Sequence, residues 1–490
     1  MFRQAKWDEG LLVEIGKEGR IGYVPPEPLG PDVQLRIPGH LVRKELNLPS
    51  LTEAQVVRHF VRLSQMNYAV DLGIYPLGSC TMKFNPKLND RIANDERVTN
   101  AHPYQHHSTV QGLLSLLYEL QTNLAEITGM DEVSLLPAAG AHGELVGVLM
   151  IRKYLQSRGQ YEKNEILIPD SAHGTNPASA AMADFDVITV PSDERGMVSF
   201  EDLKKLVGKK TAGMMMTVPN TLGLFEEDIL KISKLIHENG GLMYYDGANM
   251  NAILGRVRPG DIGFDIVHMN LHKTFSTPHG GGGPGSGPVG VKAFLREYMP
   301  VPILEKKGES YSWRHDLPHT IGRIKEGYGN VGVLIRALSY LLTLGPEGLV
   351  DVSSQSVVAS NYLLRKLEKQ HYQLNHGQNY PRKHEFVVSA KPLTKNGVNA
   401  LRVAKALLDE GLHPPTIYFP LIVDEAMMVE PTESEPVEEL DRYAEAMNSI
   451  ARRSAEELAS SPKNTSVKTL DEAKASHPLT LRLTWRSQKK

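Results

Sequence analysis

Short apolar runs and amphipathic stretches alternate along the chain between residues 111 and 295. The runs lack the apolar–polar alternation of a strand that has one wet face. Strands buried on both faces are typical of a mostly parallel sheet covered by helices, so the pattern predicts a large α/β domain. We predict helices at 113–127, 144–155 and 229–237, and strands at 133–136, 165–168, 187–190, 214–218, 242–245, 266–270 and 289–291.

The rest of the chain has a different pattern and predicts a smaller domain with flanking segments. Apolar periodicity favours an α+β domain over 331–460. Residues 1–110 predict an N-terminal arm with a short helix at 51–63, the large domain occupies 111–330, and 461–490 form a polar tail. Within the smaller domain we predict helices at 331–344, 349–367 and 437–460, and strands at 384–388 and 416–419.

A lysine and an aspartate stand where two of the apolar runs end. The run 266–270 leads to Lys273 and then to the glycines Gly280 to Gly283, whose bare backbone lets a bulky ligand approach. The run 242–245 ends in Asp246. Pyridoxal phosphate needs both groups, because its aldehyde bonds to a lysine and its ring nitrogen stays protonated beside an anion. We interpret Lys273 as the Schiff-base lysine and Asp246 as the ring-nitrogen partner. The alternatives are a solvated loop lysine and a helix-capping aspartate.

Two more strand ends predict a phosphate site and a stacking group. After one predicted strand, Ala139, Gly140 and Ala141 open a helical stretch, and unpaired N–H groups at the positive end of a helix attract phosphate. His173 follows the next strand, where its flat imidazole could lie on a pyridine ring. An ordinary tight turn and a structural histidine are the plainer interpretations. The four features appear in chain order at strand ends, as expected when ligands gather at the carboxyl edge of an open α/β sheet.

Composition narrows the class of protein. The 490 residues carry 54 lysines and arginines against 57 acids, a net charge of −3, so neither nucleic acid nor a membrane surface is an expected partner. The one cysteine, Cys80, fits a reducing cytosol. No secretory signal is evident, and no apolar stretch is expected to reach the roughly 20 residues that span a bilayer. His102, His106 and His107 lack a neighbouring acid or cysteine at ligand spacing, so we predict no metal site.

Taken together, these motifs resemble the pyridoxal-phosphate-bearing half of the glycine cleavage system P-protein. The length of the chain is similar to that of the second subunit of members that are split into two chains. One departure is Val218, which stands where the family commonly has asparagine. The residues that carry the resemblance are 75–83, 137–144, 170–177, 246–249, 270–275, 280–285 and 413–420.

The resemblance implies a fold-type I pyridoxal-phosphate-dependent transferase fold and a set of roles. Lys273 would hold the cofactor, Asp246 would keep its ring nitrogen protonated, and His173 would stack on the ring. His272 and the 139–141 turn would hold the phosphate. Glycine would lose carbon dioxide, and the remaining aminomethyl group would pass to the lipoyl arm of H-protein. A separate subunit 1 would complete a heterotetramer with two copies of each chain, in the prokaryotic cytoplasm.

Other interpretations stay open at this point. A different fold-type I pyridoxal enzyme, such as an amino-acid decarboxylase or a desulfurase, would share the lysine and aspartate but would work without a carrier protein. A non-catalytic scaffold subunit would be expected to lack one of these two residues. The residue that holds the carboxylate of glycine is also open, with Arg323, Arg382 and Lys383 as candidates.

Overall fold

The computed structural model describes residues 9–27, 30, 37–44, 46, 48–102, 104–279 and 285–481. The glycines Gly280 to Gly283 therefore lie outside the described residues. The chain divides into two compact units, one made of Met1–Leu72 with Ser460–Lys490 and the other of Gly73–Ala459. These boundaries differ from the predicted four-part division, which stays a prediction about domains.

The smaller unit contains the predicted short helix. Helix α2 spans Glu53–Gln65 and begins at Thr52, whose hydroxyl accepts a hydrogen bond from the backbone N–H of Gln55 while the Gln55 side chain accepts one from the N–H of Thr52. This reciprocal cap satisfies two N–H groups that the first turn would otherwise leave unpaired. The other helices that the structure describes in this unit are α1 (Leu12–Ile15), η1 (Gly39–Leu41) and α14 (Glu472–Ser476).

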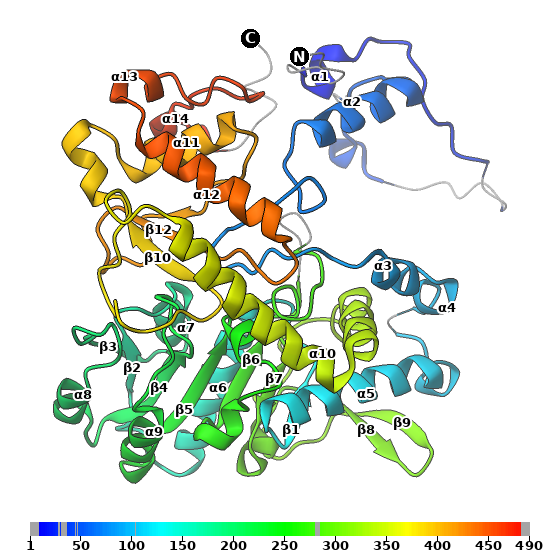
Figure 1. The fold of residues 1–490 in the computed structure, drawn as a ribbon. Helices are drawn as coiled ribbons and strands as arrows, with labels where there is room; N and C mark the ends of the chain where they lie inside the picture. The colour runs from blue at the N-terminus through cyan, green and yellow to red at the C-terminus, as the bar shows by residue number, and fades with distance from the viewer. Residues whose placement is uncertain are drawn as a thin grey trace. The chain divides into compact units, whose positions relative to one another are not determined.

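The larger unit is built on a sheet of seven strands among the described residues, in the order β1-β7-β6-β5-β4-β2-β3 (Figure 1). Neighbouring strands from β6 through β3 are parallel, and β7 runs antiparallel to β6 and β1. The predicted fold class is thus confirmed. The strands are β1 (Glu132–Ser134), β2 (Glu165–Pro169), β3 (Asp186–Val190), β4 (Thr211–Thr217), β5 (Leu242–Gly247), β6 (Ile266–Met269) and β7 (Val289–Val291).

Consecutive residues of the central strands enter two different hydrophobic cores. On β5, Met243 and Tyr245 pack into one core, while Leu242 and Tyr244 pack into the other. Both faces of the sheet are therefore buried at the central strands, which explains why β5 is apolar from Leu242 to Tyr245 instead of alternating with polar residues. Helices α5 (Gln111–Thr128), α8 (Phe200–Leu206) and α9 (Ile229–Glu238) contribute to the first core, and α6 (Gly140–Ser157) and α7 (Thr175–Met182) to the second.

A second, smaller sheet follows in the chain. Three described strands pair antiparallel in the order β10-β12-β11, namely β10 (Phe386–Ser389), β12 (Ala426–Val429) and β11 (Thr416–Ile417). The strand predicted at 416–419 stops early because Tyr418 has a left-handed backbone, with φ of 59°. The helix predicted at 437–460 is wrong in extent. It ends at Ala451 (α12, Val437–Ala451), and Ser454 caps a separate helix, α13 (Ala455–Leu458).

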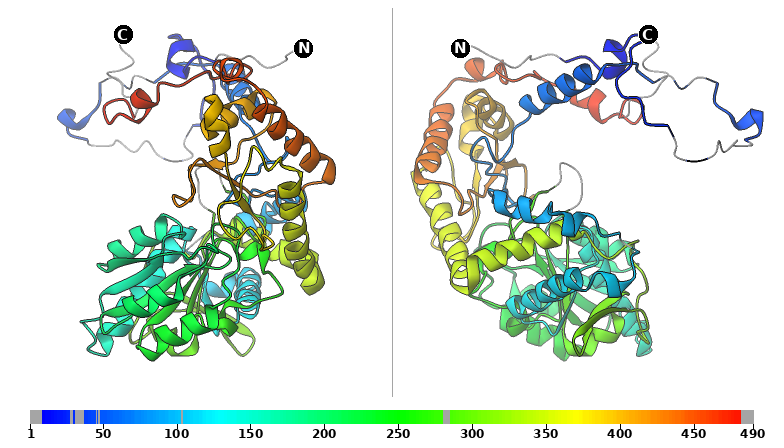
Figure 2. Two further views of the ribbon diagram at one scale, coloured as in Figure 1. Left: turned by 60° about the vertical axis from the view of Figure 1, so that its left-hand side comes forward. Right: turned by 90° about the vertical axis from the view of Figure 1, so that its right-hand side faces the viewer.

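Helix α10 (Val331–Lys366) runs from the large sheet to the small one (Figures 1 and 2). Its backbone is broken at Gly345, where φ is 64° and ψ is 179°, so the two predicted helices meet at this kink. By length and apolar composition alone it is the one helix among the described residues that could cross a membrane, but it is broken at Gly345 and packs in the cores of both sheets. Leu338 packs in the core of the large sheet and Leu363 in that of the small one.

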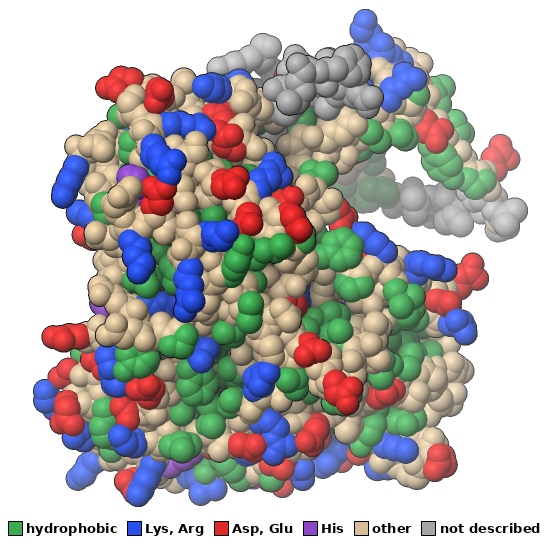
Figure 3. Space-filling model, viewed as in Figure 1, with side chains coloured by type: hydrophobic (Ala, Val, Ile, Leu, Met, Phe, Trp, Pro, Cys, Tyr) green, Lys and Arg blue, Asp and Glu red, His purple; other side chains and the backbone are tan. Residues whose placement is uncertain are grey.

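The remaining elements of the larger unit are short and connect the main layers. They are α3 (Lys87–Ala93), α4 (Glu96–Thr99), η2 (His107–Thr109), η3 (Met250–Ala252), η4 (Pro259–Ile262), η5 (Ala293–Tyr298), β8 (Ile303–Lys307), β9 (Ser310–Arg314), η6 (Lys391–Asn396) and α11 (Ala400–Asp409). On the face of this unit shown in Figure 3, acidic and basic side chains are interspersed. That face therefore offers no broad surface of one sign among the described residues.

Helix α6 can lie directly on the sheet because residue 147 is glycine. A methyl group at Gly147 would come within 2.1 Å of Cε2 of Tyr244, a fully buried side chain. Gly147→Ala should therefore lower the free energy of unfolding by about 1–3 kcal/mol through overpacking. The matched control is Gly112→Ala in α5, which meets no atom within 4 Å. It should raise stability by up to about 1 kcal/mol. Urea unfolding followed by circular dichroism measures both, and equal effects would contradict this packing.

Candidate active site

The carboxyl ends of the parallel strands bring the predicted site residues to one edge of the large sheet. Asp246 lies at the end of β5, His173 follows β2, and Lys273 follows β6. Gly140 begins helix α6 at the same edge. Parallel strands end together, so side chains far apart in the sequence become neighbours there.

Ser79 connects two of these residues. The Nζ of Lys273 donates a hydrogen bond to the backbone oxygen of Ser79 at 2.8 Å, and the Ser79 hydroxyl lies 3.2 Å from Nδ1 of His173. Ser79 has a φ of 70°, a left-handed conformation that is unusual for a residue with a side chain. Burial lowers the pKa of His173 to about 4, so its imidazole is neutral at physiological pH. A neutral flat ring can stack and hydrogen-bond without adding charge.

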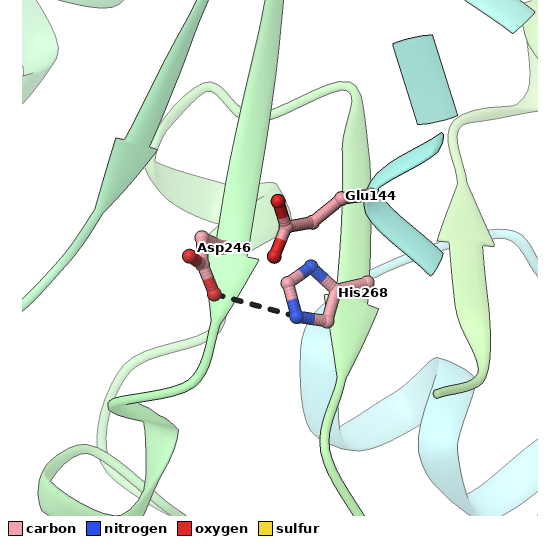
Figure 4. Close-up of side chains that lie close together, drawn as sticks. All are labelled: Glu144, Asp246 and His268. Carbon is pink, nitrogen blue, oxygen red and sulfur yellow. Dashed lines mark ion pairs between the residues drawn. The ribbon is translucent and has the colours of Figure 1, made fainter. Parts of the chain in front are cut away.

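Asp246 is buried with an imidazole beside it (Figure 4). Nε2 of His268 is 3.3 Å from one oxygen of Asp246, and the backbone N–H of Ala248 donates to the same oxygen at 2.9 Å. Burial opposes ionisation, but His268, His173 and Lys273 outweigh it and lower the pKa of Asp246 to about 2. Asp246 is therefore a permanent buried anion, which is what a protonated ring nitrogen requires.

A second buried acid, Glu144, lies next to Asp246 (Figure 4). Burial, with Asp246 nearby, raises the pKa of Glu144 to about 7. The side-chain amide of Asn176 donates to both carboxylates, at 3.0 Å each. Thr175 and Ser179 also donate to Glu144. Sequence analysis did not assign Glu144 a role, although it ends the turn motif that contains the predicted phosphate cradle.

The predicted phosphate turn is a place where backbone segments approach closely. Ala139 is the N-cap of α6, with Gly140 and Ala141 in its first turn. A methyl group on Gly140 would lie 2.3 Å from Oδ1 of Asn270, and one on Gly287 would lie 2.1 Å from the carbonyl oxygen of Ala139. Only glycine fits at position 287, where the facing atom belongs to the backbone, and a side chain at position 140 would have to displace the Asn270 amide. The free N–H groups of the first turn of α6 are thus presented at the edge of the sheet that carries Lys273.

His272 lies against the same backbone. A methyl group on Gly285 would lie 2.0 Å from its Nδ1, and this nitrogen accepts a hydrogen bond from the N–H of Ser286 at 3.3 Å. Burial, together with His279 and Lys273, lowers the pKa of His272 to about 3. The ring is therefore neutral and can contribute a hydrogen bond, not a charge, to any anion at the turn.

Two glutamates that sequence analysis missed reach the site from the small sheet. Glu385 directly precedes β10 and Glu430 directly follows β12, and both are fully buried. Glu385 accepts a hydrogen bond from the N–H of Ser79, and Glu430 accepts one from the N–H of Thr81. A carboxylate at the end of an apolar run was the signal that identified Asp246, and it was present here too.

The candidates for a carboxylate-binding cation lie elsewhere. Arg382 is buried and donates to the carbonyl oxygen of His376, and Lys383 faces the ring of Phe225. Among the described residues, neither these two nor Arg323 makes a hydrogen bond or an ion pair with the predicted catalytic side chains. The assignment of a glycine-carboxylate holder thus stays without support.

Comparison with solved structures identifies the fold. The structure superimposes on a crystal structure of glycine decarboxylase (P-protein) of the glycine cleavage system in inhibitor-bound form, with a TM-score of 0.69 and 21% identity, over 87% of this chain and 93% of that one. A NifS-like protein matches with a TM-score of 0.60 and 15% identity, over 77% and 99%. At these identities the likeness concerns the fold, which is that of the fold-type I pyridoxal-phosphate-dependent enzymes.

Sequence relatives identify the family within this class. The family model described as glycine cleavage system P-protein matches residues 31–307, and that described as glycine dehydrogenase, C-terminal domain, matches 352–475. A probable glycine dehydrogenase (decarboxylating) subunit 2 of Thermococcus onnurineus is 56% identical, covering 99% of this chain and 97% of the relative. One of the same name from Bacillus licheniformis is 50% identical, covering 97% and 99%. The chain belongs to the glycine cleavage system P-protein family.

The side-chain amide of Asn176 should stabilise the folded protein, because it donates to two adjacent buried acids. Asn176→Ala leaves Asp246 and Glu144 without their shared donor, so the free energy of unfolding should fall by about 1–3 kcal/mol. Because burial raises the pKa of Glu144 to about 7, its folded-state proton is lost as pH rises through that value. The loss of stability should therefore be greater at about pH 8 than at about pH 6. Urea unfolding at both pH values measures it, with the exposed Asn239→Ala as control. A pH-independent loss would contradict this account of Glu144.

Proposed function

We propose that this chain catalyses the decarboxylation of glycine in the glycine cleavage system, as the pyridoxal-phosphate-bearing subunit of a two-subunit enzyme. Full-length relatives at 50–56% identity carry the name of that activity. The observation that carries the proposal is the meeting of Lys273, His173 and the buried anion Asp246 at one sheet edge, with Ser79 between the first two. A non-catalytic scaffold subunit would not need these three side chains at one sheet edge.

The residues at the site fit pyridoxal phosphate. Among the described residues, the buried Oγ1 of Thr274 has no hydrogen-bond partner, and the buried Nε2 of His173 and Oδ1 of Asn270 face only Asn249 and His268, without a well-formed hydrogen bond. Buried polar atoms normally have partners, so a polar ligand at this edge would satisfy them. Gly140 and Gly287 carry no side chain, so the N-terminus of α6 stays open to a phosphate group. These observations support the cofactor that the family implies.

Each side chain then has a task that follows from its chemistry. Bound pyridoxal phosphate supplies an electron sink for the bonding pair left when carbon dioxide departs. Asp246 keeps a proton on the ring nitrogen by remaining ionised, and His173 provides a neutral flat surface for the ring. Lys273 provides the amine that bonds to the cofactor. His272 and the 139–141 turn provide hydrogen bonds to the phosphate.

The reaction needs partners that this chain does not supply. Decarboxylation breaks the bond between Cα and the carboxyl carbon of glycine. The electron pair of this bond reduces the lipoyl disulfide of H-protein, so that one sulfur receives the aminomethyl group and the other takes up a proton. The name "subunit 2" among the relatives supports a companion subunit 1. We propose two copies of each subunit. Prokaryotic relatives and the single cysteine support a cytoplasmic location.

Exchange of labelled carbon dioxide into glycine tests the activity. The wild-type chain, assembled with its companion subunit and lipoylated H-protein, should catalyse the exchange, because reversal of decarboxylation requires the whole set. Lys273→Ala should reduce the rate to background, since it removes the amine that we propose bonds to the cofactor. Lys153→Ala, an exposed residue of α6, is the matched control. Turnover of another amino acid without any carrier protein would instead indicate a different pyridoxal enzyme.

The phosphate cradle can be tested separately by adding pyridoxal phosphate to the cofactor-free protein. Gly140→Ala places a methyl group against Asn270 and crowds the first turn of α6. An overpacking cost of 1–3 kcal/mol predicts a dissociation constant raised by about 5- to 150-fold. Visible absorption of the bound cofactor measures the affinity, and Gly112→Ala should leave it unaltered. An unchanged affinity in Gly140→Ala would show that the cofactor does not bind at this turn.

A further inference from the structure

Two acidic side chains, Glu385 and Glu430, lie close together beside the Ser79–Thr81 loop, which contacts Lys273. Oxygen atoms of Glu385 and Glu430 lie within 4.8 Å of each other, and both side chains have no exposed surface. Two ionised carboxylates this close, and out of water, repel each other strongly, so one of them holds a proton. The hydrogen-bond donors around the pair determine which one.

Glu385 has the environment of an ionised carboxylate. One of its oxygens accepts the N–H of Ser79 at 2.8 Å, and the other accepts the side-chain amide of Asn249 at 3.0 Å. The amide of Asn249 cannot be reversed without loss, because the same nitrogen donates to the carbonyl oxygen of Pro219 at 3.0 Å. Both neighbours are therefore donors, and both oxygens of Glu385 are required as acceptors.

Glu430 has room for the proton. One of its oxygens accepts the N–H of Thr81 at 3.0 Å, while the other lies 2.5 Å from the Thr81 hydroxyl. The Thr81 hydroxyl is placed to donate to an ionised Glu430, and because a hydroxyl can also accept, a protonated Glu430 can keep the same hydrogen bond by donating to Thr81. Burial raises the pKa of both carboxyl groups, that of Glu430 to about 7 and that of Glu385 well above its usual range, so the pair holds a proton, and the donors that face both oxygens of Glu385 assign it to Glu430.

The surroundings of the pair leave Lys273 as the cation that faces it. His384 is 3.8 Å from Glu385 and 4.0 Å from Glu430, too far for a hydrogen bond, and burial lowers the pKa of His384 to about 3, so the ring is neutral. Burial also raises the pKa of the Cys80 thiol, which keeps its proton. The titratable and charged groups that face the pair are Lys273, His384, Cys80 and Glu433, the last of which is neutralised by Lys83 at 2.6 Å.

We propose that Glu385 and Glu430 share one proton, carried by Glu430, and that as positioning residues they hold the Ser79–Thr81 loop against Lys273. The loop needs such anchors, because Ser79 and Thr81 both have left-handed backbones, with φ of 70° and 43°. Ser79 in turn fixes Lys273 through its carbonyl and His173 through its hydroxyl. The inference rests on the proposed function, because the proposed function assigns Lys273 its role as the amine that bonds to the cofactor.

Infrared spectroscopy of the cofactor-free chain tests the protonation state without any assay of activity. Below neutral pH, the difference spectrum between wild type and Glu430→Gln should show the loss of one protonated carboxyl band. Glu438→Gln, at an exposed residue of α12, removes a solvent-facing carboxyl group instead and serves as the control, which should leave the band of the buried protonated carboxyl in place. Loss of an ionised carboxylate in Glu430→Gln would overturn the proposal.

The pH profile of carbon dioxide exchange by the assembled enzyme tests the positioning role. Wild type should lose activity on the alkaline side of neutrality, because removal of the Glu430 proton creates two adjacent buried charges. Glu430→Gln should retain the rate within about threefold and lose this alkaline fall, since its amide donates to Thr81 and has no such proton to lose. Glu385→Gln should be at least about tenfold slower at every pH, because it places an N–H against a donor.

The outcomes separate the inference from the proposed function. Equal rates for the two glutamine variants, or an alkaline fall that persists in Glu430→Gln, would overturn the shared proton and the positioning role. A wild-type enzyme that catalyses no exchange at all would refute the proposed function, while the infrared result would still decide where the proton lies.

Discussion

The hydrogen bond from Lys273 to the backbone oxygen of Ser79 is the contact on which the site depends. Lys273 follows the last parallel strand of the large sheet, and Ser79 belongs to a loop that is anchored by residues beside the small sheet. The loop also reaches His173, which follows a different strand of the large sheet. One strained backbone segment thus fixes the relative positions of an amine, an imidazole and two carboxyl groups.

Burial of charge explains why so many polar side chains surround this contact. A carboxylate in a dry interior is stable only with donors or cations around it. Asp246 has Asn176, the N–H of Ala248 and a nearby imidazole, and Glu385 has Asn249 and the N–H of Ser79. A shift of any one element would leave several of these atoms unpaired. The rigidity of the site therefore follows from the cost of unpaired buried polar groups, and it holds reactive groups in place before a ligand arrives.

The sequence was sufficient for the sheet and for the residues at strand ends, and insufficient where distant segments decide the structure. Uninterrupted apolar runs predicted the parallel strands, and the end of each run located Asp246 and Lys273. The predicted strand at 416–419 failed because Tyr418 has a left-handed backbone conformation that its local pattern does not encode. Ser79 was missed as a site residue because its partner Glu385 lies 306 positions away, and no local spacing can reveal such a pair.

The central claim is that Lys273 is the amine that bonds to the cofactor, and chemical trapping tests it most directly. The enzyme loaded with pyridoxal phosphate would be reduced with borohydride, digested, and mapped by mass spectrometry. The account predicts one labelled peptide, with the cofactor attached to Lys273. A label on a different lysine, such as the buried Lys83, or a protein that carries no label after loading, would contradict it.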